Sequence, residues 1–439
     1  MVVSTEDQTL AGIAHDRDDI EDAIRSGLQA RETILEEYTT PEIVELLAAA
    51  ARAWCAPHYA RRKTVVRSLC DTLRMHPAML EQGMDAIFGV ITEEALNRWI
   101  EQEVGEPERL GAPARDPRGR LLGPRVIFHA LAGNIPGLAI PQICAAALAR
   151  SVCVLRESRR QPLLTSAFLD TLAELSPELA SLIVPAAWAP NDTLTEKFVF
   201  DWSDHIEVTG SDDVIKTIAS RHARRRIVAH GNRLSIAVVP RDADPQQWVN
   251  GLARDIVLYD GMGCLTPQLI LIEGDDTACE KWEHPLGIAL ERLSVLWPRE
   301  PRMPAQENAR RAFLSDAEVA AACDPECGLV LGRDDAWAIR IDARARWVCG
   351  PGSRIVTMVP IADLDEALDL IHDSETPLAG VALADDPNSE SFAAFGSEVQ
   401  EAGASLVCPV GELQRPGLAW QPDGAERLGG IVAWRVEET

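Results

Sequence analysis

One of the ten cysteines lies in a local pattern suited to nucleophilic chemistry. Cys264 follows the turn Asp260-Gly-Met-Gly263 and leads into the strand-like run Leu269 to Ile272. A cysteine at such a turn can present its thiolate at a domain surface, on backbone whose N–H groups face an incoming carbonyl group. A small residue buried at the start of a strand gives the same pattern. We predict that Cys264 is a catalytic nucleophile.

A second candidate, Asn134, lies in the segment Leu131-Ala-Gly-Asn-Ile-Pro-Gly137, between a predicted strand at 126–131 and a predicted helix at 138–149. A side-chain amide in this position can donate to an oxygen that gains negative charge, and one such donor contributes about 3–4 kcal/mol in acyl transfer. The alternative is a turn asparagine that hydrogen-bonds its own backbone.

A third candidate feature is the turn Thr209-Gly210-Ser211, between a predicted strand at 205–209 and a predicted helix at 212–221. The first N–H groups of a helix and the positive end of its dipole suit a pyrophosphate. The same residues also suit an ordinary helix start. The chain contains no Gly-x-Gly-x-x-Gly motif, which argues against an ordinary Rossmann dehydrogenase.

The order of these features resembles the aldehyde dehydrogenase superfamily, and Gly-Cys264-Leu-Thr-Pro-Gln resembles its fatty-acyl reductase branch, typified by the bioluminescence fatty-acid reductases. The resemblance covers about residues 125–435 and leaves the preceding part unmatched. It implies that the Asn134 amide and the Cys264 backbone N–H hold an oxyanion. It further implies that Thr209, Gly210 and Ser211 contact a dinucleotide.

The resemblance also implies a basic cofactor segment after the predicted strand at 151–155. Arg156 takes the place of a lysine near the cofactor ribose, and Ser158 matches a serine of the family. Arg159 replaces the glutamate that binds ribose hydroxyls in NAD-preferring members. Because arginine can pair with a 2′-phosphate, the substitution favours NADPH over NADH. A solvated basic loop on an acidic protein is the alternative interpretation.

Hydrolytic aldehyde dehydrogenases carry a water-activating glutamate where this chain has Val228-Ala-His230-Gly-Asn-Arg233-Leu-Ser235. The absence of that glutamate is consistent with an acyl-enzyme that is not hydrolysed. His230 could replace it as a general base, since imidazole titrates near neutral pH. A packing or substrate-contacting histidine is an equally good interpretation.

Composition narrows the class of protein. The chain has 439 residues, of which 46% are hydrophobic, enough for more than one core. Its formal net charge of -26 argues against nucleic acid as a partner, and the apolar region at 128–155 is too interrupted by Gly and Pro for a membrane span. The scattered cysteines are typical of a reduced, cytoplasmic protein. Cys323 and Cys327 have no matching second pair, so we predict no metal site.

The alternation of strands and helices after residue 125 predicts an α/β protein, and the resemblance implies an aldehyde dehydrogenase-like fold with two Rossmann-type domains and an N-terminal helical lead-in. We expect a helical segment at 1–105, an NAD(P)-binding domain at 106–245, a catalytic domain at 246–400 and a segment at 401–439 that packs back on the body.

The resemblance thus predicts an NADPH-dependent reductase that converts an acyl thioester to an aldehyde through an acyl-enzyme on Cys264. The acyl donor would be acyl-CoA or an acyl-carrier protein, with a partner acyltransferase possible and a homo-oligomer expected. One alternative is an NAD(P)-dependent aldehyde dehydrogenase with His230 as base. Another is a non-catalytic acyl-binding member of a multi-enzyme assembly.

Overall fold

The computed structural model describes residues 13–111, 120–157, 162–275, 277–300 and 303–435. Five helices precede the first sheet: α1 (Arg17–Glu37), α2 (Thr40–Cys55), α3 (Ala60–Leu73), α4 (Pro77–Phe88) and α5 (Glu93–Glu103). Their starts are encoded locally. Asp16 and Thr92 cap α1 and α5 with side-chain oxygens, and Thr39 forms a reciprocal capping box with Glu42.

The first sheet has five parallel strands: β2 (Val126–Ala130), β3 (Val152–Arg156), β4 (Ile183–Ala186), β5 (His205–Thr209) and β6 (Val228–His230). The strand order is β4-β3-β2-β5-β6. The helices between these strands are α6 (Ala139–Leu148), α7 (Pro162–Leu175), α8 (Pro177–Ser181), α9 (Thr193–Trp202) and α10 (Asp212–Arg221). The order reverses between β2 and β5, and such a reversal opens a ligand crevice beyond the carboxyl ends of the two strands.

The second sheet has seven strands in the order β13-β12-β7-β8-β11-β10-β9. They are β7 (Leu234–Val239), β8 (Pro267–Glu273), β9 (Gly328–Leu331), β10 (Ala338–Ile341), β11 (Ile355–Ile361), β12 (Leu378–Leu383) and β13 (Leu406–Pro409), and only β9 pairs antiparallel. The helices are α11 (Pro245–Val257), α12 (Ala278–Leu296), α13 (Pro304–Cys323), α14 (Leu364–His372) and α15 (Glu390–Glu401). Short 3-10 turns lie at Pro107–Arg109, Leu258–Gly261, Arg333–Asp335 and Pro422–Gly424.

The structure corrects one expected boundary. The expected NAD(P)-binding domain, 106–245, includes β7, but β7 pairs with β8 and β12 of the second sheet. Residues 231–233 therefore form the crossing between the two sheets. Alternation along the chain predicts that a strand exists, but the choice of sheet depends on neighbours that are distant in the sequence.

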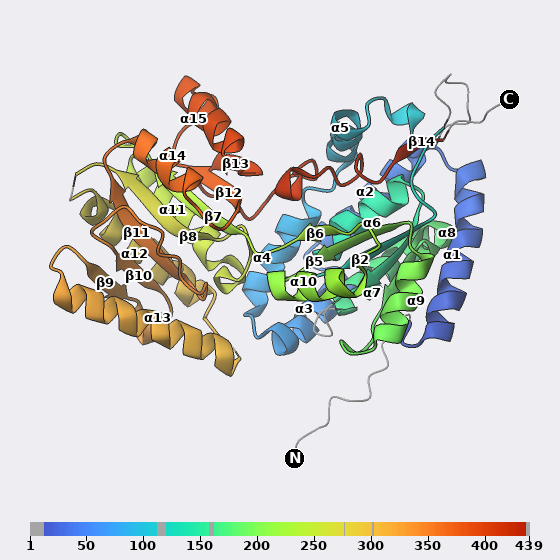
Figure 1. Cartoon of the computed structure of the whole chain (residues 1–439), viewed down its shortest axis with the longest axis horizontal. Helices are drawn as coiled ribbons and strands as arrows, with labels where there is room; N and C mark the ends of the chain where they lie inside the picture. The colour runs from blue at the N-terminus through green and yellow to red at the C-terminus, as the bar shows by residue number, and fades with distance from the viewer. Residues whose placement is uncertain (1–12, 112–119, 158–161, 276, 301–302, 436–439) are drawn as a thin grey trace, which may run out of the picture.

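The two sheets meet end to end (Figure 1). Because the crossing at 231–233 is so short, the carboxyl end of β6 lies next to the amino end of β7. The carboxyl edge of the first parallel sheet consequently faces the amino edge of the second. The C-terminal segment returns from the second sheet to the first domain, where β14 (Ala433–Arg435) pairs with β1 (Arg120–Leu122).

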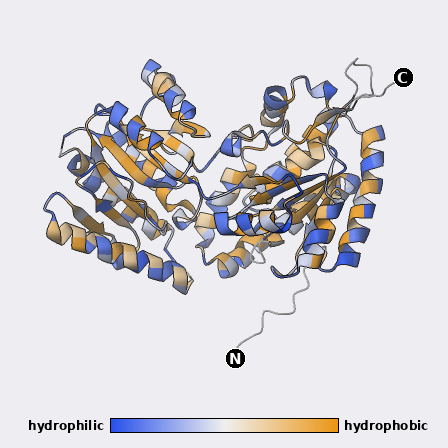
Figure 2. Cartoon of the chain, in the orientation of Figure 1, coloured by the Kyte–Doolittle hydropathy of each residue, from blue (hydrophilic) through white to orange (hydrophobic). Residues whose placement is uncertain are grey.

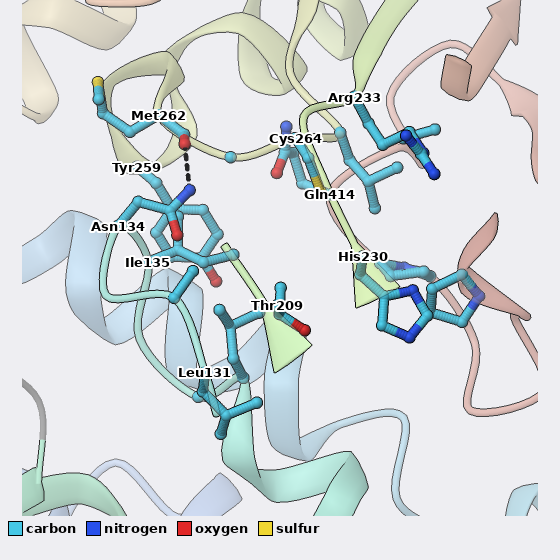
Figure 3. Close-up of a pocket in the computed structure, with 18 of the residues that line it drawn as sticks. Leu131, Asn134, Ile135, Thr209, His230, Arg233, Tyr259, Met262, Cys264 and Gln414 are labelled. Carbon is cyan, nitrogen blue, oxygen red and sulfur yellow. Dashed lines mark hydrogen bonds between the residues drawn. The ribbon is translucent and has the colours of Figure 1, made fainter. Parts of the chain in front are cut away.

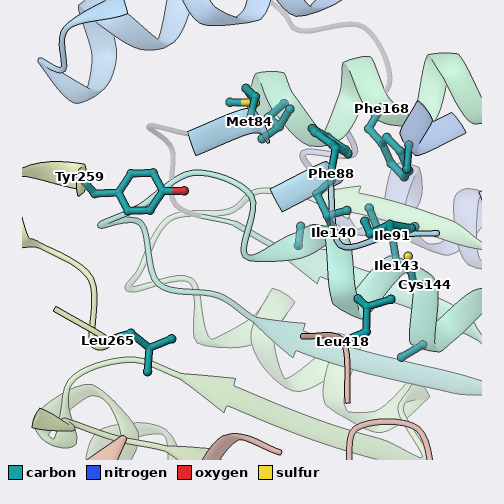
Figure 4. Packing of buried hydrophobic residues seen from close by; sticks show 14 of the residues in the cluster. Met84, Phe88, Ile91, Ile140, Ile143, Cys144, Phe168, Tyr259, Leu265 and Leu418 are labelled. Carbon is teal, nitrogen blue, oxygen red and sulfur yellow. The ribbon is translucent and has the colours of Figure 1, made fainter. Parts of the chain in front are cut away.

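Apolar residues concentrate in the strands and on the inner faces of the helices (Figure 2). The N-terminal helices share a core with the first sheet, in which Trp54 stacks on Phe88 with ring centroids 5.0 Å apart. Phe168 packs against both rings and lies near Phe88 in Figure 4. The same cluster continues to Tyr259 and Leu265, beside the predicted nucleophile. The helical lead-in is thus part of one continuous core.

A single glycine tests how closely α1 docks on this body. A Cβ atom on Gly27 would lie 2.8 Å from the Ser181 carbonyl oxygen and 3.1 Å from Val152. We expect Gly27→Ala to lower the free energy of unfolding by about 1–2 kcal/mol, because overpacking outweighs the better helix propensity of alanine. Urea unfolding measures this, with the exposed neighbour Ser26→Ala as control. A stabilised Gly27→Ala variant would contradict the packing.

Candidate active site

A cavity of about 510 Å³ lies between the facing edges of the two sheets. Its walls come from the loop after β2, the turn after β5, the crossing at 231–233, the turn before β8 and the C-terminal segment at 414–427. The structure brings together six of the predicted site residues in this wall: Asn134, Thr209, Gly210, Ser211, His230 and Cys264. Figure 3 shows four of them, Asn134, Thr209, His230 and Cys264. α4 adds apolar lining through Ala86 and Ile87.

The turn that carries Cys264 has an unusual backbone. Tyr259, Asp260 and Gly261 have φ angles of 56°, 54° and 69°, in the left-handed region. A second such run at residues 352–354 packs directly against it, so that a Cβ atom on Gly352 would lie 2.4 Å from the Gly261 carbonyl oxygen. Left-handed non-glycine residues cost about 1–3 kcal/mol each and persist only where the surroundings hold them.

A buried ion pair holds these two runs together. The Arg354 guanidinium donates to the Asp260 carboxylate at 2.7 Å, and both side chains have 0% exposure. Arg354 also donates to the Ser294 hydroxyl at 3.2 Å. The pair bridges the turn before Cys264 and the segment before β11. It therefore fixes the position of the turn at 259–264, here called the nucleophile turn after the predicted role of Cys264, relative to the second sheet.

Two further hydrogen bonds, from residues of β7 and of the loop after β2, hold the same turn. The Ser235 hydroxyl donates to the Cys264 carbonyl oxygen at 2.8 Å, and the Asn134 amide donates to the Met262 carbonyl oxygen at 2.7 Å (Figure 3). Asn134 thereby ties the first domain to the nucleophile turn. An amide carries two N–H groups, so this bond occupies one of them.

Cys264 is exposed in the cavity, whose walls partly desolvate its thiol. This desolvation raises the pKa of the thiol, and the negative charge of Asp423 raises it further. The backbone N–H groups of Cys264 and Leu265 and the positive charge of Arg427 act in the opposite direction. The net pKa lies above that of an ordinary cysteine, so forming the thiolate depends on the cationic side of this balance.

His230 lies between two carboxylates. Its Nδ1 is 2.6 Å from Asp423 and its Nε2 is 3.2 Å from Glu207. Burial alone would lower the pKa of His230, but the hydrogen bonds to Asp423 and Glu207 outweigh it and raise the pKa to about 9. His230 is therefore an imidazolium at neutral pH, and this geometry does not support the interpretation of His230 as a resting general base.

Sequence reasoning missed the carboxylates that control His230. Glu207 is buried on β5, where the charges of His129 and His230 and hydrogen bonds with its neighbours hold its pKa well below the usual range despite the burial. Asp423 lies 193 residues from His230 along the chain and also pairs with Arg233. Glu207 could have been suspected from its place two residues before Thr209; no local signal marks Asp423.

The turn after β5 fits a dinucleotide pyrophosphate. Residues 209–211 line the cavity at the N-terminus of α10, where the Ser211 side chain makes no capping hydrogen bond in the described structure. The first N–H groups of α10 can therefore bind an anion. Asp212, in the first turn, is engaged by the Asn232 N–H at 3.0 Å.

The basic cofactor segment is only partly described. Ser158 and Arg159 lie outside the described residues. Arg156 ends β3 but does not line the cavity; its guanidinium lies over the Trp188 ring at 4.9 Å. The described residues hold no group of three or more His, Cys, Asp or Glu side chains placed to bind a metal ion. None of the described helices has the length and apolar composition that a bilayer crossing requires.

The fold is that of an aldehyde dehydrogenase, as predicted. A benzaldehyde dehydrogenase from Corynebacterium glutamicum superposes with a TM-score of 0.70 at 14% identity, over 95% of this chain and 89% of that one. A succinic semialdehyde dehydrogenase from Streptococcus pyogenes, whose structure was determined with NADP+, superposes with a TM-score of 0.70 at 12% identity. The superposition covers 96% of this chain and 95% of that one. At these identities the likeness concerns the fold alone.

Within this fold the chain belongs to the acyl-CoA reductase (LuxC) family, whose model matches residues 35–434. The predicted resemblance is confirmed, but the match starts at the end of α1 and not at residue 125, so that α2 to α5 of the helical lead-in lie within it. The chain is an oxidoreductase of this family.

The similar curated proteins are acyl-protein thioester reductases. Long-chain acyl-protein thioester reductase 2 from Photobacterium leiognathi is 24% identical over 86% of this chain and 80% of its own length. The enzyme from Aliivibrio fischeri is 23% identical over 77% of this chain and 71% of its own length. The enzyme from Photobacterium phosphoreum is 28% identical over 59% of this chain and 54% of its own length.

The position of His230 between the Asp423 and Glu207 carboxylates predicts a pH dependence of protein stability. A folded-state pKa near 9, above the unfolded value of about 6.5, contributes stability that is fully present below pH 6.5 and is lost as the pH rises through 9. We expect Asp423→Asn to lower the pKa of His230 and so to reduce the loss of stability between pH 7 and 9. Urea unfolding at several pH values measures this, with the exposed Glu426→Gln as control. If the free energy of unfolding fell equally with pH in wild type and in Asp423→Asn, Asp423 would not raise the pKa of His230.

Proposed function

We propose that the protein reduces an acyl thioester to an aldehyde with NADPH, through an acyl-enzyme on Cys264. One observation carries the proposal: the nucleophile turn, the uncapped N-terminus of α10 and an imidazolium share one cavity. The family assignment and the names of the similar curated proteins support the same reaction class.

The first half-reaction is a thioester exchange. The Cys264 sulfur attacks the acyl carbonyl carbon, a C–S bond forms, and the carbonyl oxygen becomes an oxyanion. The backbone N–H of Cys264 and the second N–H of the Asn134 amide are the donors for that oxygen. The original C–S bond then breaks, and the leaving thiolate takes a proton for which the His230 imidazolium is the acid in the cavity wall.

The second half-reaction reduces the acyl-enzyme. Thr209, Gly210, Ser211 and the first turn of α10 would hold the dinucleotide. Arg156, which ends β3 outside this cavity wall, would contact its ribose, as the resemblance implies. When bound, NADPH supplies the hydride for the acyl carbon. The thiohemiacetal on Cys264 then releases the aldehyde as its C–S bond breaks, and the sulfur regains its proton.

The absence of a water-activating base explains why the acyl-enzyme would survive until reduction. His230 stands where hydrolytic relatives of the fold carry glutamate, and its two carboxylate partners keep it protonated. A protonated imidazole cannot take a proton from water. An aldehyde oxidiser that uses His230 as base would need to displace one of these carboxylates first.

The acyl donor is proposed to be an acyl group held as a thioester on a protein or on CoA. The similar curated proteins are named for acyl-protein thioesters, which favours a protein-borne acyl group. The apolar wall from Ala86, Ile87, Val90, Ile135 and Leu138 supports an acyl chain as the group that enters the cavity.

Replacement of Cys264 tests the covalent step. We expect Cys264→Ala to form no acyl adduct with acyl-CoA or acyl-carrier protein, while NADPH binding stays within about twofold of wild type, because the α10 turn is untouched. Intact-mass spectrometry before and after NADPH addition measures adduct and release. Cys323→Ala, which removes another exposed thiol, should retain the adduct. An adduct on Cys264→Ala would exclude this nucleophile.

Cofactor preference tests the basic segment. We expect Arg156→Gln to weaken NADPH binding by about tenfold and NADH binding much less, because an arginine–phosphate contact is charge-assisted. Fluorescence titration of both cofactors measures the ratio, and the exposed Arg344→Gln in the second domain is the control. Equal loss for both cofactors would place Arg156 in a structural role only.

A further inference from the structure

The C-terminal segment forms one wall of the cavity and is anchored at its far end by the helical lead-in. After β13 it crosses back from the second sheet to the first domain (Figure 1). The backbone N–H groups of Leu428 and Gly429 donate to one oxygen of Glu103, at the end of α5, at 2.7 and 3.1 Å. This carboxylate fixes the chain immediately after Arg427.

Arg427 lies in the cavity wall with incomplete hydrogen bonding. Its guanidinium lies over the Trp420 ring, 5.2 Å from the centroid, and donates to the Leu418 carbonyl oxygen at 3.3 Å. Its Nε–H is buried and has no acceptor in the described structure. A buried charged group with an open donor is costly unless an anion reaches it.

The other cations of the cavity wall are already neutralised. His230 and Arg233 both pair with Asp423, and His230 also faces Glu207. Arg427 has no carboxylate ion pair among the described residues, although the charges of Glu207, Glu103 and Cys264 act on it. Among the cations that line the cavity in the described chain, Arg427 is therefore the one whose charge is not paired with a carboxylate and can act on a new anion.

We infer that Arg427 is a further catalytic residue: its guanidinium stabilises the Cys264 thiolate before attack and the oxyanion of the acyl carbonyl afterwards. The second part rests on the proposed function, whereas the first concerns the thiol itself. In the first step the S–H bond breaks, the proton goes to solvent, and the electron pair stays on the sulfur, whose negative charge the guanidinium stabilises. No co-reactant is needed.

A cation at Arg427 would offset the groups that oppose ionisation of the Cys264 thiol. Burial and Asp423 both oppose ionisation of Cys264, and the two backbone N–H groups beside the sulfur carry only partial charges. One full positive charge nearby shifts a thiol toward its anion by about a factor of ten or more. Trp420 and Glu103 act through Arg427 and are positioning residues.

Alkylation of Cys264 by iodoacetamide between pH 6 and 11 tests the inference without any acyl substrate. Peptide mass spectrometry follows Cys264 separately from the other cysteines. We expect Arg427→Gln to raise the midpoint of the rate profile by about one pH unit and to slow alkylation about tenfold at pH 7.5. Arg415→Gln, an exposed arginine of the same segment, should leave the profile unchanged.

A second reagent separates charge from structure. Above the midpoint, the ratio of iodoacetate to iodoacetamide reactivity should fall several-fold in Arg427→Gln, because the anionic reagent loses its cation. Arg427→Lys, which keeps the charge, should retain most of the wild-type midpoint and ratio. It also provides the test if Arg427→Gln does not fold.

Two results would overturn the inference. One is a wild-type profile in Arg427→Gln, and the other is a shift in Arg427→Lys as large as one pH unit. Failure of wild-type Cys264 to be acylated by acyl-CoA or acyl-carrier protein would instead contradict the proposed function and leave the alkylation result standing.

Discussion

The connection between β6 and β7 is the constraint on which the active site depends. With only residues 231–233 between the two strands, the first sheet must present its carboxyl edge to the amino edge of the second. A carboxyl edge provides turns that open onto helix N-termini, as at Ser211. An amino edge provides the turn before β8, as at Cys264. The N-terminus of α10 and Cys264 thus lie in one cavity without any long loop between them.

Strain in the nucleophile turn is held by interactions from three directions. The Asp260–Arg354 pair fixes the turn from the second domain, Asn134 from the first, and Ser235 from the crossing strand. Each of these partners lies far from Cys264 in the sequence. Because left-handed backbone persists only where several contacts agree, the position of the thiol depends on correct docking of the two domains.

The charges of the cavity set the protonation state of His230. Glu207 and Asp423 raise the pKa of His230, so that in the proposed reaction it serves as an acid toward the departing thiolate and not as a base toward water. The same Asp423 opposes ionisation of Cys264. In the mechanism we propose, a thiolate on Cys264 therefore needs a separate cation, and Arg427, in the same cavity wall, is the residue that we infer for it.

The sequence by itself determined the local elements and the class of chemistry. Periodicity and capping residues predicted the strands at 205–209 and 126–131 and the helix at 212–221, close to where they lie, because such elements are encoded by neighbouring residues. It also singled out Cys264 in its small-residue turn and the missing glutamate at His230. α4 and β6 went unpredicted, and α4 contributes Ile87 to the cavity.

Tertiary structure alone decided the sheet to which β7 belongs, the protonation state of His230 and the surroundings of the thiol. The β7 strand has its partners in β8 and β12, of which β12 lies more than a hundred residues away. Asp423 and Arg427 reach the cavity from the C-terminal segment, and Glu103 anchors that segment from the helical lead-in. A pKa depends on charge and burial within a few ångströms, and residues this distant in sequence become neighbours only when both domains and both ends of the chain have packed.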